Sequence, residues 1–106
     1  MDVQDELTME IRDDGDGAVT LVLQGEIDFG NVATLRARLA DLIRSGTGSL
    51  TVDLAGVEFV DSTTIGVLIQ AKRRLDQAGR DFRVVQPTPG VKRTFELAGL
   101  VAFLGI

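Results

Sequence analysis

The spacing of apolar residues along the chain is the feature that most limits its fold. Apolar residues occupy every second position over residues 7–11 and again over residues 19–23. This period of two is typical of a half-buried β-strand. Between the two runs lies Asp13-Asp14-Gly15-Asp16-Gly17, whose residue types favour a turn and tolerate positive φ. We therefore expect two antiparallel strands joined as a hairpin.

After residue 30 the apolar spacing alternates between a helical period near 3.6 and short apolar runs of strand length. Polar or glycine-containing segments such as Ser45-Gly46-Thr47-Gly48 separate the runs and mark their ends. The expected elements are a helix capped by Asn31 and ending near Ser45, a strand at 50–54, a helix at 62–78, a strand at 82–85, a helix at 89–98 and a short last strand at 101–104.

The predicted order is ββαβαβαβ, which places the chain in the α/β class. Strands that are separated by helices pair in parallel through right-handed crossovers. We expect a mixed sheet, with an N-terminal antiparallel hairpin followed by parallel strands and about three helices packed on it. A length of 106 residues fits one domain, so we assign residues 1–106 to a single domain.

The chain contains no Cys and no His. This excludes disulfides, Cys/His zinc sites and a Ser-His-Asp triad within the chain, and we expect neither catalysis nor a cofactor or metal. The net charge of −5 argues against binding to nucleic acid or to an anionic membrane. No segment approaches the roughly 18 apolar residues of a membrane span, and the polar start is unlike a signal peptide. We expect a cytoplasmic protein.

Four residues that favour the start of a helix, Asp61-Ser62-Thr63-Thr64, stand between an apolar strand end and the predicted helix. Their simplest role is capping, because their oxygens accept bonds from unpaired helix N–H groups. One cap explains one of them but not all four. A helix start also tolerates an anion, so a hydroxyl there could be phosphorylated without unfolding the domain. A phosphate adds roughly −1.5 to −2 charge at neutral pH.

Three stretches of the sequence resemble a STAS domain of the anti-sigma factor antagonist family. Gly25-Glu26-Ile27-Asp28 is similar to a segment after the second strand of that family. Residues 52–68, which include Val60-Asp61-Ser62-Thr63-Thr64-Ile65-Gly66, resemble its central phospho-acceptor signature. Residues 91–100 resemble its third-helix signature. The three stretches occur in the family's order and spacing, over nearly the whole chain.

The resemblance implies a partner switch and not an enzyme. An antagonist of this family binds an anti-sigma factor that is also a serine kinase, and the sigma factor is thereby released. The kinase phosphorylates the Ser after the signature Asp, here Ser62, with Thr63 as the second choice. The phosphorylated form dissociates, and a separate serine phosphatase resets it. The residues implied in partner binding are Glu26, Asp28, Asp61, Ser62, Thr63, Thr64 and Gly66.

Several of these residues could instead have a purely structural role. Asp28 could form an Asx turn or cap the first helix. Gly66 costs a helix about 1 kcal/mol against Ala, so we expect it to allow either close packing on the sheet or room for a partner. The family usually has Gly where this chain has Thr64, which could alter how closely a kinase approaches.

The end of the chain is a second departure from the family. Many relatives carry a further helix after the last strand, whereas this sequence stops at Ile106. We expect apolar surface near Phe103 and Leu104 to be exposed there and to favour self-association.

Three alternative functions are open. The chain could be a STAS subunit of a stress-signalling scaffold or of a lipid ABC transporter. It could be a small nucleotide-binding or hydrolytic protein that uses carboxylates. It could also be a structural domain with a well-capped helix. The basic run Lys72-Arg73-Arg74 is expected to be a solvated helix face.

Overall fold

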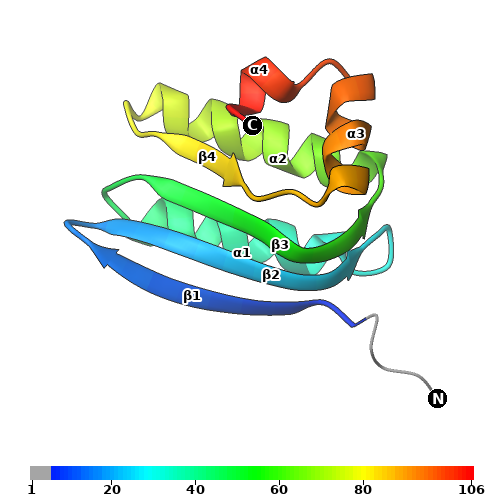
Figure 1. The fold of residues 1–106 in the computed structure, drawn as a ribbon. Helices are drawn as coiled ribbons and strands as arrows, with labels where there is room; N and C mark the ends of the chain where they lie inside the picture. The colour runs from blue at the N-terminus through cyan, green and yellow to red at the C-terminus, as the bar shows by residue number, and fades with distance from the viewer. Residues whose placement is uncertain (1–5) are drawn as a thin grey trace.

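The computed structural model describes residues 6–106, which form four strands and four helices in one α/β domain (Figure 1). The alternating apolar pattern and the helical spacing account for the position of most of these elements. Their bounds are β1 Thr8–Gly15, β2 Ala18–Ile27, α1 Val32–Ser45, β3 Leu50–Val60, α2 Ser62–Gln77, β4 Phe82–Val85, α3 Pro89–Leu97 and α4 Val101–Leu104.

The four strands form one sheet in the order β1-β2-β3-β4. Strands β1 and β2 are antiparallel, with Ile11 opposite Leu21. Strand β3 pairs in parallel with β2 and with β4. The predicted mixed sheet, with an antiparallel hairpin followed by parallel strands, is therefore confirmed.

The core lies between the sheet and the long helices α1 and α2, which cover the same face of the sheet (Figure 1). Alternate residues of β3, namely Leu50, Val52 and Leu54, are almost fully buried. Each buried side chain of this size contributes roughly 1.5–3 kcal/mol through the apolar area that it removes from water. This packing fixes the two helices on the sheet and so fixes the start of α2.

The end of the chain differs from the prediction. Residues Val101–Leu104 form the short helix α4 and not a strand, so the chain has four helices over residues 6–106. A run of four apolar residues is too short for its period to be read, and Gly105 ends the helix with a left-handed φ of 71°.

The predicted exposure of apolar surface at this end is only partly right. Leu104 is fully buried, and the expectation for that residue was wrong. Phe103 is 37% exposed, and the Lys72 Nζ lies 5.9 Å from the centre of its ring. The cation covers part of the ring.

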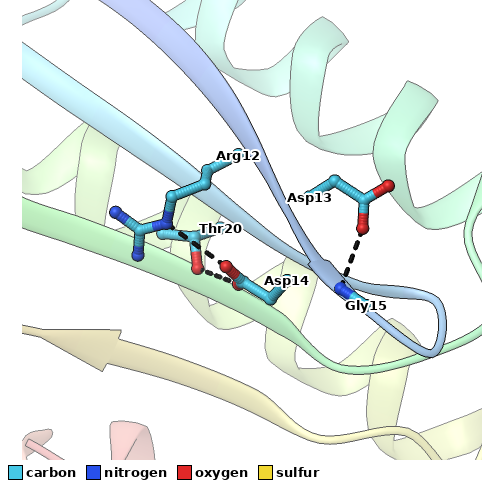
Figure 2. A network of polar contacts seen from close by, with 5 residues as sticks. All are labelled: Arg12, Asp13, Asp14, Gly15 and Thr20. Carbon is cyan, nitrogen blue, oxygen red and sulfur yellow. Dashed lines mark hydrogen bonds and ion pairs between the residues drawn. The ribbon is translucent and has the colours of Figure 1, made fainter.

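The β1–β2 hairpin carries a network of polar contacts, which Figure 2 shows from close by. The hydroxyl of Thr20, a residue that is 3% exposed, donates a 2.5 Å bond to Asp14 Oδ2. Arg12 Nε donates to the other oxygen of the same carboxylate at 3.2 Å. Asp13 Oδ1 accepts the Gly15 N–H at 2.9 Å and so closes the turn. The hairpin turn that the Asp/Gly composition predicts is confirmed.

These contacts change the acidity of Asp14. The bond from the Thr20 hydroxyl lowers the pKa of Asp14 below its ordinary value of 3.8, against partial desolvation, and Arg12 adds to the lowering. Within residues 6–106, no group of three or more acidic residues is placed to hold a metal ion. None of the helices over the same residues is long and apolar enough to cross a membrane.

Candidate functional site

The candidate site lies where β2 and β3 end side by side. Ile27 and Val60 are paired at the last register position of these parallel strands. The chain leaves β2 into the β2–α1 loop at 28–31 and leaves β3 directly into α2, which begins at Ser62. Since the carboxyl ends of parallel strands meet at one edge of a sheet, this topology brings the two predicted segments 25–28 and 60–66 together (Figure 1).

Asp61 caps helix α2. Its backbone is extended, with φ −110° and ψ −176°, and its Oδ1 accepts the N–H groups of Thr63 at 3.0 Å and Thr64 at 3.2 Å. The Thr64 N–H also lies 3.2 Å from the Asp61 carbonyl oxygen. N–H groups in the first turn of a helix lack a full set of intrahelical partners, so the carboxylate helps to satisfy them and stabilises the helix start. The capping role that the sequence suggested is confirmed for Asp61.

The same carboxylate is held in its ionised form. The pKa of Asp61 is lowered from its ordinary value of 3.8, chiefly by a bond from the Thr63 hydroxyl, against partial desolvation. Backbone N–H groups of Thr64, Thr63 and Phe29 lower it further. A fixed negative charge therefore stands next to Ser62 at neutral pH.

The three hydroxyls after Asp61 lie in different surroundings. Ser62 is exposed, and its hydroxyl forms no hydrogen bond with another residue in the described part of the chain. Thr63 is half-buried and donates a 2.5 Å bond to Asp61 Oδ1. Thr64 is fully buried, and its hydroxyl lies 3.4 Å from both the Ile27 carbonyl oxygen and Asp61 Oδ1. Only Ser62 presents an uncommitted hydroxyl to solvent.

Thr64 thus has a structural role inside the protein, below the exposed Ser62. Its methyl and hydroxyl are both inside the protein, where the hydroxyl links α2 to the end of β2. A buried hydroxyl needs such a partner, because leaving it unpaired costs about 1–3 kcal/mol. The β-branched side chain that stands in place of the family's usual Gly therefore does not project toward an approaching partner.

The β2–α1 loop is braced by its own side chains. Asp28 is exposed, and its Oδ1 accepts the Gly30 N–H at 2.8 Å, which is the Asx turn that the sequence suggested. Asn31 occupies the cap position of α1 but makes no capping bond, so that prediction was wrong. Its amide instead donates to the Glu26 carbonyl oxygen at 2.8 Å and accepts the Asp28 N–H at 3.0 Å.

Glu26 itself is half-buried near the end of β2. Its partner in the sheet register is Phe59 of β3. The residue therefore lies at the same edge of the sheet as Asp28 and Ser62, and its role in partner binding stays a prediction.

Two aromatic residues at this edge were not singled out by the sequence reasoning. Phe29 is 82% exposed in the β2–α1 loop, and Phe59 is 50% exposed near the end of β3. A large apolar side chain in water gains nothing for the fold, so exposed aromatics beside a candidate site are typical of a contact surface. The available signal was the position of Phe29 between Asp28 and Gly30, outside any apolar period.

Gly66 lies one turn after Ser62 in α2 and is exposed. A Cβ built on it would meet no atom within 4 Å, apart from its neighbours in the helix. The expectation that Gly66 permits close packing on the sheet is therefore wrong. The alternative reason, space for a partner, stays a prediction.

The comparisons with known proteins agree with this geometry. The STAS domain family matches residues 8–106. The anti-sigma F factor antagonist of Lysinibacillus sphaericus is 29% identical over 83 residues, which cover 77% of this chain and 71% of that protein.

Solved structures give the same result. A crystal structure of an anti-sigma factor antagonist from Mycobacterium paratuberculosis is 27% identical, with a TM-score of 0.84, and the match covers 94% of this chain and 84% of that chain. The Bacillus cell fate determinant SpoIIAA in its phosphorylated form shares the fold, with a TM-score of 0.73 at 21% identity over 90% of this chain and 86% of that chain. Since the family match spans all the described strands and helices, this chain belongs to the STAS domain family.

Proposed function

We propose that this protein is an anti-sigma factor antagonist that binds a kinase-type anti-sigma factor, releases its sigma factor, and is switched off by phosphorylation of Ser62. The antagonists among its relatives support the first part of the proposal. The phosphorylated form of SpoIIAA, which has the same fold, is consistent with the second. The chain supplies a substrate hydroxyl and no catalytic group, and it acts in the cytoplasm.

The observation that carries the proposal is the difference between the three neighbouring hydroxyls. A kinase needs a hydroxyl that can reach its nucleotide, and Ser62 is exposed with no hydrogen bond to another described residue. Phosphorylation of Thr63 would remove the 2.5 Å hydrogen bond that its hydroxyl donates to Asp61 Oδ1. Phosphorylation of Thr64 would require the start of α2 to open, because that side chain is fully buried. Ser62 is therefore preferred over the second choice, Thr63.

Electrostatics explain how a phosphate on Ser62 would switch binding without unfolding the domain. The N-terminus of the 16-residue helix α2 favours an anion on its first turn. The new charge of roughly −1.5 to −2 would stand beside Asp61, whose carboxylate is already ionised. A partner that packs against the neutral hydroxyl would have to desolvate both charges, and its affinity would fall.

The proposed contact surface consists of Ser62 and its exposed neighbours. Phe29 and Phe59 offer apolar area and Asp28 offers a carboxylate, while Glu26 lies half-buried at the same edge of the sheet. Gly66 leaves open space one turn further along α2. Two protein partners follow: an anti-sigma factor serine kinase for the free form, and a serine phosphatase for the phosphorylated form.

The direct test is to map the phosphorylation site. The purified chain is incubated with ATP and its cognate kinase-type anti-sigma factor, and the product is analysed by mass spectrometry. We expect one phosphate, on Ser62, and none on the Ser62→Ala variant. Thr63→Val is the matched control, because it removes the neighbouring hydroxyl and leaves Ser62 in place.

Phosphate on Ser62→Ala to the same extent as on the wild type would overturn the assignment of Ser62. Binding of the anti-sigma factor with no phosphorylation of any residue would leave an antagonist without this switch. Absence of both binding and phosphorylation would return the choice to the other STAS functions, such as a scaffold or transporter subunit.

A further inference from the structure

A shallow groove runs between helices α1 and α2, beside the proposed phosphorylation site. Its deeper part has a volume of about 170 Å³ and an apolar floor that includes Leu39, Val67 and Ala71. A second hollow shares Val67 with the first and continues to Thr63 and Gly66. The two hollows hold about 170 and 240 Å³. Each alone is smaller than the roughly 300–1,000 Å³ of typical small-molecule sites, so the groove suits a few side chains of a docked protein segment.

Two arginines border this groove. Arg36 of α1 lines both hollows, and Arg74 of α2 lines the deeper one. Both are exposed, and neither forms an ion pair with a residue in the range 6–106. The acidic residues of the two helices are already engaged, since Asp41 pairs with Arg44 and Asp76 pairs with Lys72 at 2.8 Å. The groove therefore presents positive charge that nothing in the described structure neutralises.

The helices as a group are also positively charged. Helices α1, α2 and α3 carry eight basic and three acidic residues, a net charge of +5, although the chain as a whole carries −5. The strands, loops and ends therefore carry −10. An excess of positive charge on these helices, in a chain that is acidic overall, steers acidic partners toward them.

We propose that the α1–α2 groove docks an acidic segment of the anti-sigma factor. Carboxylates of that segment pair with Arg36 and Arg74, and an apolar side chain between them lies on the floor at Val67. The inference rests on the proposed function and extends its interface. The occupant is the anti-sigma factor because the groove is continuous with Thr63 and Gly66, which lie within one turn of Ser62.

The test reverses charges inside and outside the groove by the same amount. The variant Arg36→Glu/Arg74→Glu changes the two groove arginines. Its matched control, Arg38→Glu/Arg73→Glu, changes one arginine on each of the same helices outside the groove. All four residues are exposed, so both variants are expected to fold. Affinity for the purified anti-sigma factor is measured by calorimetry at two salt concentrations, and folding is checked by circular dichroism.

We expect the groove variant to bind at least about tenfold more weakly and with a weaker salt dependence than the wild type. The control should stay within about threefold of the wild type, because it alters only the general field of the helices. Equal losses in the two variants would show that net charge matters and would overturn the groove while the proposed function stands.

Two further outcomes are informative. A wild-type chain that neither binds the anti-sigma factor nor is phosphorylated by it would overturn the proposed function, and the groove assignment with it. Sedimentation of the chain alone gives the remaining case. Self-association that the groove variant abolishes, with unchanged affinity for the anti-sigma factor, would assign the groove to a second copy and overturn the proposal.

Discussion

Two places in this molecule use the same local chemistry. At the β1–β2 hairpin, the Thr20 hydroxyl donates a 2.5 Å bond to Asp14 (Figure 2). At the start of α2, the Thr63 hydroxyl donates a 2.5 Å bond to Asp61. In both places the threonine bond is the main reason that the pKa of the aspartate is lowered. A short Asp–Thr pair is therefore not in itself a mark of a functional site.

The surroundings of the two pairs differ. The carboxylate of Asp14 also accepts a bond from the Arg12 guanidinium, so both of its oxygens are bonded to residues of the hairpin. The carboxylate of Asp61 meets no cation among residues 6–106 but accepts backbone N–H groups at a helix start. The next residue, Ser62, is exposed.

The candidate site is therefore formed by the exposed residues beside the Asp–Thr pair and not by the pair itself. At the hairpin, each of the residues drawn in Figure 2 takes part in a hydrogen bond that holds the turn or the strand. At α2, the pair fixes the helix start and leaves Ser62 and Phe29 exposed beside it. Rigid support for one exposed hydroxyl suits a protein that is recognised and modified by its partners.

The largest effect is expected from Asp61→Ala. The change removes the helix cap, so it should lower the free energy of unfolding by about 1–2 kcal/mol and loosen the start of α2. Binding of the anti-sigma factor should weaken as well. Urea unfolding and calorimetry measure the two effects. Asp61→Asn should keep most of the stability, because Asn caps helices about as well as Asp; an equal loss in both variants would show that charge and not capping is what matters.

The hairpin pair provides the contrasting case. Thr20→Val removes the matching hydroxyl with little change in volume and should lower the free energy of unfolding by about 0.5–1.5 kcal/mol. Because the hairpin lies away from Ser62, the same variant should bind the anti-sigma factor and accept phosphate as the wild type does. A defect in phosphorylation at full folding would break the distinction between the two regions.

A smaller effect of opposite sign is expected at Gly66. Since a Cβ there meets no atom, Gly66→Ala should raise the free energy of unfolding by about 0.4–1 kcal/mol. If the open space admits a partner, the stabilised variant should nevertheless bind the anti-sigma factor more weakly.

The control for Gly66→Ala is Ala33→Gly on the exposed face of α1, which should change stability alone. Gly79→Ala is unsuitable as a control, because φ is positive at Gly79.

The smallest expected effect is on the titration of the two aspartates, Asp14 and Asp61. Because both aspartates have a lowered pKa in the folded state, each stabilises the protein above about pH 4, and this contribution is lost as the pH falls through the folded-state value. Carbon-13 NMR titration should place both carboxylates below 3.8. Added salt should raise the pKa of Asp14 more than that of Asp61, because in the described part of the chain only Asp14 of the two has a neighbouring cation. An equal response would contradict the difference in surroundings.

Much of the fold could be predicted because apolar spacing is a local property of the chain. The strands of the hairpin and the helices α1 to α3 follow directly from period two or period 3.6. Helix α4 was missed because four apolar residues at 101–104 carry no readable period. The capping of α1 was also predicted wrongly, since Asn31 has the right residue type but its amide bonds to Glu26 and Asp28 instead.

The site was predictable in position but not in detail. The residue types at 61–64 indicated a helix start, and the resemblance indicated a phospho-acceptor. Which hydroxyl is free depends on burial and on bonds between distant residues, such as that from Thr64 to Ile27. Exposure of Phe29 and the groove at Arg36 likewise arise only when the elements pack together.

The central claim is that a phosphate on Ser62 switches off partner binding while the fold persists. The most direct measurement is calorimetry of the anti-sigma factor against the unphosphorylated chain and against the chain carrying one phosphate on Ser62, with circular dichroism of both forms. We predict unchanged spectra and an affinity that falls by roughly 10- to 100-fold, as expected for like charges that must be desolvated together. Removal of the phosphate should restore binding. Equal affinity of the two forms would contradict the account.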